Sequence, residues 1–405
     1  MSNRVIRVLD NGADRPGPPT ALPACERFPV KHPKSLSLLA LTAAAALALT
    51  GCSSGANGAG GGGADGRLRV VATTTQLTDF AAEVGGDDIE LTGLLPVGGS
   101  AHHFDPTPAD LLALGEADVL IVNGAGLETF IDGAVEASGF DGAIIDASQG
   151  IDLDLAREIT AEGGGAGEDH DHDHADAGED HAHEGEEAGA EADHDHADDH
   201  AHEGEDHAEE DDHDHGDLNP HLWTSVRFAQ GMVSMIAGDL AGIDPAHADG
   251  YTERADAYVA KLAALDEWIA AQYEKVPAEQ RVLVSGHDSL RYYLHDYDIE
   301  FAGSILPSFE DNAEPSAAEI EALVAAIREH GVKAIFVESS MSPKLAQTVG
   351  AEAGVTVVDA EALYADSLGP AGSGAETYLG ATERNTATIL EAWGYTLDPL
   401  PSALQ

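Results

Sequence analysis

The chain has 405 residues and a formal net charge of −55, from 74 acidic and 19 basic side chains. Such a polyanion is repelled by phosphate backbones, which argues against nucleic-acid binding and makes cations the natural partners. The only two cysteines, Cys25 and Cys52, lie near the N-terminus. We therefore expect neither a disulfide nor a thiolate metal site in the mature protein.

Residues 1–52 are predicted to be a signal peptide. A basic start precedes an apolar run of Leu and Ala at residues 36–49, which is too short to span a bilayer and fits an h-region. The run ends in Leu-Thr-Gly-Cys, which resembles the lipobox of bacterial lipoproteins and implies a lipid on Cys52. Residues 53–66, rich in Gly, Ser and Ala, are predicted to be a flexible tether. We expect export and lipid anchoring to the outer face of the bacterial cytoplasmic membrane. The alternative is a short buried helix followed by a loop.

Short apolar runs alternate with helical segments between residues 67 and 122. The pattern predicts three strands and two helices, at residues 68–73, 89–95 and 119–122 and at residues 78–84 and 108–114. This alternation indicates an α/β lobe with parallel strand pairing.

Residues 163–217 consist almost entirely of His, Asp, Glu, Ala and Gly, and between 163 and 216 no apolar residue is larger than Ala. Such a segment cannot bury a core, so we expect it to be disordered without ligand. It carries twelve histidines: His170, His172, His174, His181, His183, His194, His196, His200, His202, His207, His213 and His215. One interpretation is a solvated acidic spacer. The density of Asp-His units favours the other, a chelator that binds several zinc ions weakly and exchanges them quickly.

A long helix is predicted at residues 244–276, where apolar residues recur at spacings of three and four. A second α/β run follows, with strands predicted at residues 281–284, 334–337 and 355–358 and helices at residues 323–327, 345–353 and 378–393. The simplest architecture is two α/β lobes with parallel sheets, at residues 67–243 and 277–405, joined by this one helix.

Three histidines outside the acidic segment follow apolar strand-like runs or stand in sharp turns: His102, His221 and His287. Loops at strand ends are where α/β lobes place ligand-binding groups, and a neutral imidazole is a good zinc ligand. Taken singly, each is more simply an ordinary polar loop residue. Sequence spacing alone cannot join them, because they lie tens of residues apart.

Four segments carry recognisable motifs. They read Ser-Ala-His-His-Phe-Asp-Pro-Thr-Pro at residues 100–108, Asn-Pro-His-Leu-Trp at 219–223, His-Asp-Ser-Leu-Arg-Tyr-Tyr at 287–293 and Leu-Tyr-Ala-Asp-Ser at 363–367. From Arg67 to its end, the chain resembles the zinc/manganese solute-binding proteins of ABC importers. That family has two α/β lobes, a rigid helix between them and one metal in the interlobe cleft.

The resemblance implies four metal ligands, two from each lobe: His102, His221, His287 and Asp366. The first motif lacks the Asp-Pro that usually precedes its histidine, so His103 stays a minor alternative to His102. Three imidazoles and one carboxylate favour zinc. Manganese-type members commonly carry Glu at the position of His287, and a manganese- or iron-binding protein remains the alternative.

The implied function is high-affinity capture of zinc by a monomer, which hands it to the permease and ATPase of an importer in the membrane. A metal-storage or adhesin lipoprotein on the same scaffold is a second possibility. A zinc hydrolase is the competing enzyme class, with Asp366 as general base. No His-Glu-x-x-His helix or Ser-centred nucleophile motif supports it, and we expect no enzymatic activity.

Overall fold

The computed structural model describes residues 66–162, 218–309, 314–358 and 363–405. The predicted signal peptide, the tether up to residue 65, Cys52 and the histidine-rich segment lie outside these ranges. None of the helices within them is both long and apolar enough to cross a bilayer.

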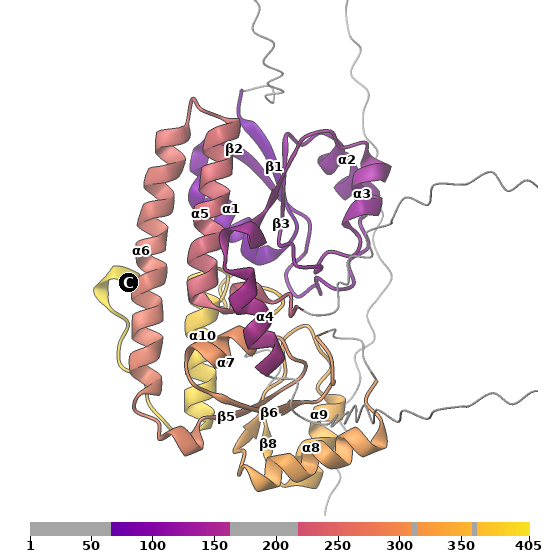
Figure 1. Ribbon diagram of the computed structural model, residues 1–405, viewed down its shortest axis with the longest axis vertical. Helices are drawn as coiled ribbons and strands as arrows, with labels where there is room; N and C mark the ends of the chain where they lie inside the picture. The colour runs from indigo at the N-terminus through magenta and orange to yellow at the C-terminus, as the bar shows by residue number, and fades with distance from the viewer. Residues whose placement is uncertain (1–65, 163–217, 310–313, 359–362) are drawn as a thin grey trace, which may run out of the picture. The chain divides into compact units, whose positions relative to one another are not determined.

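The N-terminal sheet has four parallel strands in the order β2-β1-β3-β4. They are β1 (Leu68–Ala72), β2 (Ile89–Gly93), β3 (Val119–Val122) and β4 (Ala143–Asp146). Alternate side chains of β1 and β3 face opposite sides of the sheet, as the pleat requires. One face packs against α1 (Thr75–Gly85), and the other against α2 (Pro108–Gly115) and α3 (Ile131–Ser138) (Figure 1).

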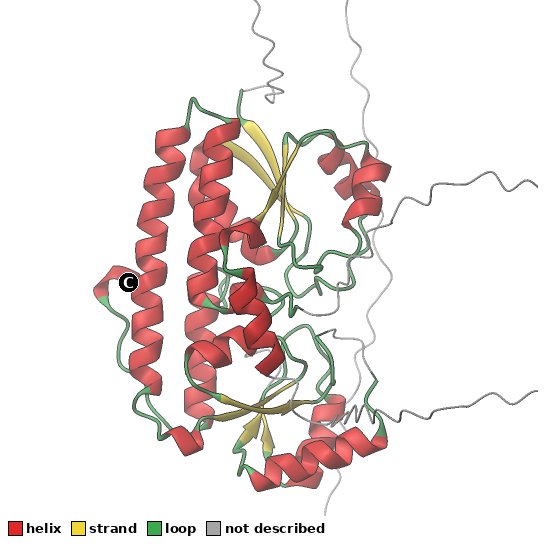
Figure 2. Cartoon of the chain, in the orientation of Figure 1, coloured by secondary structure: helices red, strands yellow, loops and turns green. Residues whose placement is uncertain are grey.

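The C-terminal sheet repeats this plan in the order β6-β5-β7-β8, again all parallel. Its strands are β5 (Val282–Ser285), β6 (Glu300–Ser304), β7 (Ala334–Ile335) and β8 (Thr356–Val357). One face is covered by α8 (Ala317–Glu329) and α9 (Lys344–Ala353), and α7 (Arg291–Asp296) lies on the other (Figure 2). The predicted fold class, two α/β lobes with parallel sheets, is confirmed.

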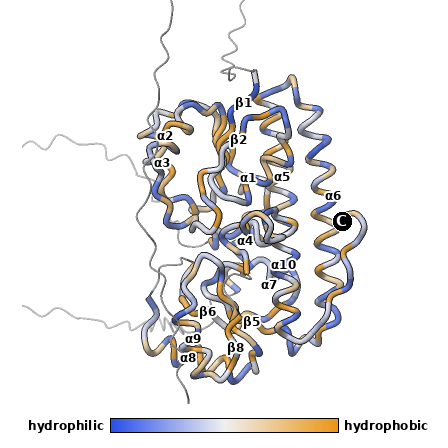
Figure 3. The backbone as a smooth tube through the Cα atoms, turned by 180° about the vertical axis from the view of Figure 1, so that it is seen from behind, coloured by the Kyte–Doolittle hydropathy of each residue, from blue (hydrophilic) through white to orange (hydrophobic). Residues whose placement is uncertain are grey.

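A layer of long helices connects the lobes. α6 (Ala248–Tyr273) runs beside both sheets, with α5 (Val226–Ile243) and α10 (Tyr378–Ala392) packed along it (Figure 1). The largest hydrophobic cluster runs without a break from the N-terminal sheet through these helices to α7. The central strands β3 and β5 are mostly hydrophobic, whereas α6 alternates between hydrophobic and hydrophilic residues (Figure 3). Because both lobes share this core, a wide hinge motion would expose apolar surface, which is costly.

Several elements were not predicted. The short strands β4 and β6 and the short helices α3 and α7 offer too few apolar repeats to stand out. α4 (Leu153–Glu162), in the predicted N-terminal lobe, packs against α7. The lobe boundaries at residues 243 and 277 therefore stay a proposal.

Helix α5 was also missed, although it is long, because glycines interrupt its sequence. One of them has a packing role. A Cβ on Gly231 would lie 2.3 Å from the carbonyl oxygen of Gly150, so only glycine lets the backbones approach this closely.

Candidate metal centre

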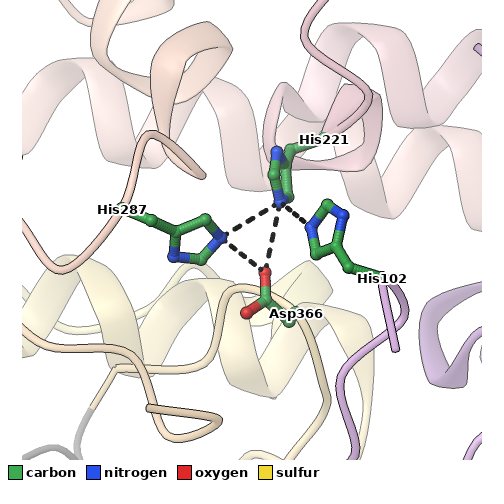
Figure 4. A group of neighbouring side chains, drawn as sticks. All are labelled: His102, His221, His287 and Asp366. Carbon is green, nitrogen blue, oxygen red and sulfur yellow. Dashed lines mark hydrogen bonds and ion pairs between the residues drawn. The ribbon is translucent and has the colours of Figure 1, made fainter. Parts of the chain in front are cut away.

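The four predicted ligands come together in space. One donor atom from each of His102, His221, His287 and Asp366 lies within 4.8 Å of every other (Figure 4). Within the described ranges, this is the single group of three or more potential ligand side chains that meets this criterion. His103, the minor alternative, is exposed and lies outside the group.

The fold explains this convergence. His287 follows β5 within two residues, and His102 lies in the loop between β2 and α2. His221 begins the turn that leads into α5, and Asp366 lies in the loop before α10. Since ligand groups in α/β folds gather beyond the carboxyl ends of parallel strands, the two sheets present their loops to a common point.

The donor atoms are buried and close. The exposed fractions are 5% for His102, 0% for His221 and His287, and 1% for Asp366. The Nε2 atom of His221 lies 3.0 Å from Nε2 of His102 and 3.3 Å from Nε2 of His287. Oδ1 of Asp366 lies 3.3 Å from Nε2 of both His221 and His287.

These distances suit a bound cation. Oδ1 of Asp366 accepts no well-directed hydrogen bond in the described part of the chain, although it is buried. Four buried polar donor atoms that converge on one point are costly unless protons or a cation lie between them. A metal ion at the centre would satisfy all four donors at once.

Glu338 supports His287 from behind. Its Oε1 atom lies 3.3 Å from Nδ1 of His287, and the carboxylate also accepts bonds from the Gly286 amide (3.0 Å) and the Ser289 hydroxyl (2.7 Å). Glu338 is fully buried. A carboxylate on the far nitrogen fixes the imidazole's orientation and directs Nε2 to the site, as in many zinc proteins.

The same surroundings alter the protonation of His287. Burial opposes the charged form, but the Asp366 and Glu338 carboxylates outweigh it and raise the pKa of His287 well above its usual value. A proton and a metal ion therefore compete for this imidazole.

Asn219 orients His221. Its Oδ1 atom lies 2.8 Å from Nδ1 of His221, and because an amide oxygen only accepts, Nδ1 must carry the proton. The lone pair of Nε2 then faces the other donor atoms, where a metal would bind. The Asn219 amide also donates to the backbone carbonyl of Asp288 at 2.6 Å, which ties the turn before His221 to the segment after His287.

Asp366 is held ionised. Burial would raise the pKa of its carboxyl, but the His287 and His221 imidazoles, each with Nε2 3.3 Å from Oδ1, lower it well below the usual value. Oδ2 accepts a hydrogen bond from the Ser340 hydroxyl, which leaves Oδ1 directed toward the imidazoles.

The roles of Glu338 and Asn219 were not predicted. Asn219 stands in the motif of His221, two residues before the histidine. Glu338 directly follows the apolar run at residues 334–337. An acidic residue at the end of a buried strand is a signal from which a functional role could have been predicted.

Comparison with known proteins gives concordant results. The family model described as zinc-uptake complex component A, periplasmic, matches residues 70–392. The manganese-binding lipoprotein MntA of Halalkalibacterium halodurans is 28% identical over 323 residues, covering 80% of this chain and 87% of that protein. The zinc-binding protein TroA of Treponema pallidum is 27% identical over 333 residues, covering 81% and 90%.

The solved structure of the periplasmic zinc-binding protein TroA from Treponema pallidum has the same fold. It superimposes with a TM-score of 0.62 at 23% identity and covers 81% of this chain and 99% of that one. The names of these relatives refer to different metals, so the likeness alone does not identify the metal bound here.

Proposed function

Because the chain belongs to the family of periplasmic zinc-uptake components, the substrate-binding proteins of ABC metal importers, we propose that it captures zinc and delivers it to a membrane permease and ATPase. Members of this family bind a metal and pass it on, so the protein is not an enzyme. Zinc is accordingly a cargo that must be both bound tightly and released.

The buried group of three imidazoles and one carboxylate carries the proposal. A set of three nitrogen donors and one oxygen donor suits the tetrahedral coordination of zinc, whereas manganese prefers more oxygen donors. Asn219 and Glu338 hold two of the imidazoles by the nitrogen that faces away from the site. The donors are thus arranged before the metal arrives, which lowers the cost of binding.

Zinc and protons compete for His287. Nε2 of His287 lies 3.3 Å from Oδ1 of Asp366, and the carboxylates beside it raise the pKa of His287, which favours protonation over metal binding as the pH falls. Zinc displaces the proton and takes over the charge balance. Acidification therefore favours release, and neutral pH favours capture.

We assign supporting roles to two parts of the chain outside the described residues. Lipidated Cys52 would hold the protein at the outer face of the membrane, and relatives named as lipoproteins agree with this. Residues 163–217 would collect zinc weakly and raise its concentration near the site. The backbone N–H of Asn219 donates to the Thr160 hydroxyl at 3.2 Å. This bond brings the two flanks of the segment together two residues before His221. We expect the protein to act as a monomer.

A competitive titration tests the metal assignment. The full chain is loaded with zinc in the presence of a chelator strong enough to strip weak sites, and manganese is then added in excess. We expect one tightly held zinc per chain that manganese does not displace. Displacement by stoichiometric manganese would support the alternative cargo, and the absence of any tight site would refute the proposal.

A further inference from the structure

We propose that Gln76 and Trp223 are positioning residues that hold the Asp366 ligand in place from the opposite lobe. The proposal rests on the metal site proposed above and concerns what controls its fourth donor. Asp366 lies in a loop of the C-terminal half of the chain. Its backbone is nevertheless bonded to the N-terminal half.

The key contact is the carbonyl oxygen of Ala365, one residue before the ligand. It accepts a hydrogen bond from the side-chain amide of Gln76 and another from the indole N–H of Trp223, both at 2.8 Å. All three residues are at least 98% buried. Two donors from the other lobe thus use both lone pairs of this carbonyl.

The amide of Gln76 is itself fixed. Its oxygen accepts a hydrogen bond from the Thr75 hydroxyl at 3.1 Å, so its nitrogen must face Ala365. The Thr75 hydroxyl in turn accepts the backbone N–H of Leu368 at 2.9 Å. The backbone of Asp366 is therefore held on both sides by consecutive residues at the start of α1.

A further bond joins the ligand loops themselves. The backbone N–H of Gly98, in the loop that carries His102, donates to the Ser367 hydroxyl at 2.8 Å. The C-terminal lobe holds the loop at other points. The Asn385 side chain exchanges two hydrogen bonds with the Tyr364 backbone, each of 2.7 Å, and the Ser340 hydroxyl bonds Asp366 Oδ2.

Trp223 connects two ligands. It stands two residues after His221 in the same turn, and the two rings lie 5.3 Å apart at their centroids. A shift of this turn therefore displaces an imidazole donor and, through the indole N–H, the carboxylate donor. The contacts make Asp366 the donor on which both lobes act, so its placement sets how long zinc is retained.

Two substitutions remove these bonds: Gln76→Met keeps the length of the side chain, and Trp223→Phe also shortens the ring system, a change that the control below reproduces. Each is expected to weaken zinc binding by the full chain about 10- to 100-fold, the usual effect of losing a group that orients a ligand. The matched control is Trp268→Phe, on α6 and away from the site. It removes the hydrogen bond from the Trp268 indole to the Asp398 carbonyl (3.2 Å). It should leave zinc affinity unchanged.

A double-mutant cycle separates positioning from general stability. If Gln76 and Trp223 act through Asp366, neither substitution should weaken zinc binding further once Asp366→Ala is present. An equal loss in both backgrounds, or an equal loss in the Trp268→Phe control, would overturn the proposal. If Asp366→Ala alone leaves the tight site intact, the metal-site assignment itself fails. The Gln76 variant keeps the test decisive should the Trp223 variant not fold.

Discussion

Glu128 in the N-terminal lobe and Glu338 in the C-terminal lobe brace the ends of their sheets in similar ways. Glu128 accepts the Asn123 amide and the Thr73 hydroxyl, each at 2.6 Å, just as Glu338 accepts a backbone amide and a serine hydroxyl. Both are buried. Only Glu338 also faces an imidazole, that of His287. The comparison indicates that a buried glutamate that stabilises the loops at the end of a sheet also supports the metal site when it contacts a histidine in one of these loops.

A second pair of carboxylates differs in the same respect. Asp79 accepts bonds from the Tyr258 hydroxyl at 3.1 Å and the backbone N–H of Tyr378 at 2.9 Å, and it forms no ion pair within the described residues. Burial raises its pKa to about 6. The pKa of Asp366, which is more deeply buried but faces His287 and His221, is instead lowered. The neighbouring imidazoles therefore decide whether the pKa of the buried carboxyl is raised or lowered.

The largest effect is expected from His287→Ala. Apparent zinc binding energies of about 10–16 kcal/mol are shared among four ligands, so losing one should weaken the tight site about 100- to 1,000-fold. Chelator competition measures this. The exposed neighbour His103→Ala is the control and should bind zinc as the unsubstituted protein does. An equal loss in both variants would mean that the wrong histidines have been assigned.

Glu338→Gln and Glu128→Gln test the comparison of the two braces directly. The first should weaken zinc binding about 10- to 100-fold, because the imidazole loses its carboxylate partner. The second should leave zinc affinity unchanged and reduce the free energy of unfolding by about 1–3 kcal/mol. Zinc titration and denaturant unfolding of both variants give the two numbers. Equal zinc affinities would show that Glu338 is only a brace.

Asp79→Asn should alter the pH dependence of stability. The folded-state pKa of about 6 exceeds the unfolded value of 3.8, so the native protein favours protonated Asp79. Its contribution to stability is complete below pH 3.8 and is lost as the pH rises to about 6. The Asn variant lacks this loss and should be more stable at pH 7 by roughly 1–2 kcal/mol. Unfolding curves between pH 4 and 7 that run parallel for the two proteins would contradict this.

The smallest effect at the tight site is expected from deleting residues 163–217. Thr160 and Asn219 are already in contact, so a short linker can close the gap. Zinc affinity of the site should change less than about threefold, whereas the number of weakly bound zinc ions should fall, since free histidines are the lost ligands. Equilibrium dialysis at high zinc measures the capacity. An unchanged capacity would remove the collecting role of this segment.

Much of the fold could be predicted because its strands are short apolar runs between helices. β3 matches its predicted range of residues 119–122, and β1 (Leu68–Ala72) ends one residue before its predicted limit. Helix α6 begins four residues later and ends three earlier than predicted, because Asp244 and Pro245 belong to the turn before it. Local patterns failed where glycines interrupt a helix, as in α5.

Two kinds of contact make up the site, and only one of them could be predicted from the sequence. The residue types at His102, His221, His287 and Asp366 stood in motifs, so their convergence could be anticipated from the family resemblance. The contact between Gln76 and Ala365 joins positions 289 residues apart, and no local pattern reports it. Trp223 likewise gives no local signal of its role. It is buried, but its indole N–H also holds the ligand loop.

The most direct test of the central claim is X-ray absorption at the zinc edge. The protein lacking residues 163–217 is loaded with one equivalent of zinc, so that only the tight site contributes. The account predicts four nitrogen and oxygen donors at about 2.0–2.1 Å, with the multiple-scattering signature of three imidazoles. A six-coordinate shell of oxygen donors, or fewer than three imidazoles, would contradict it.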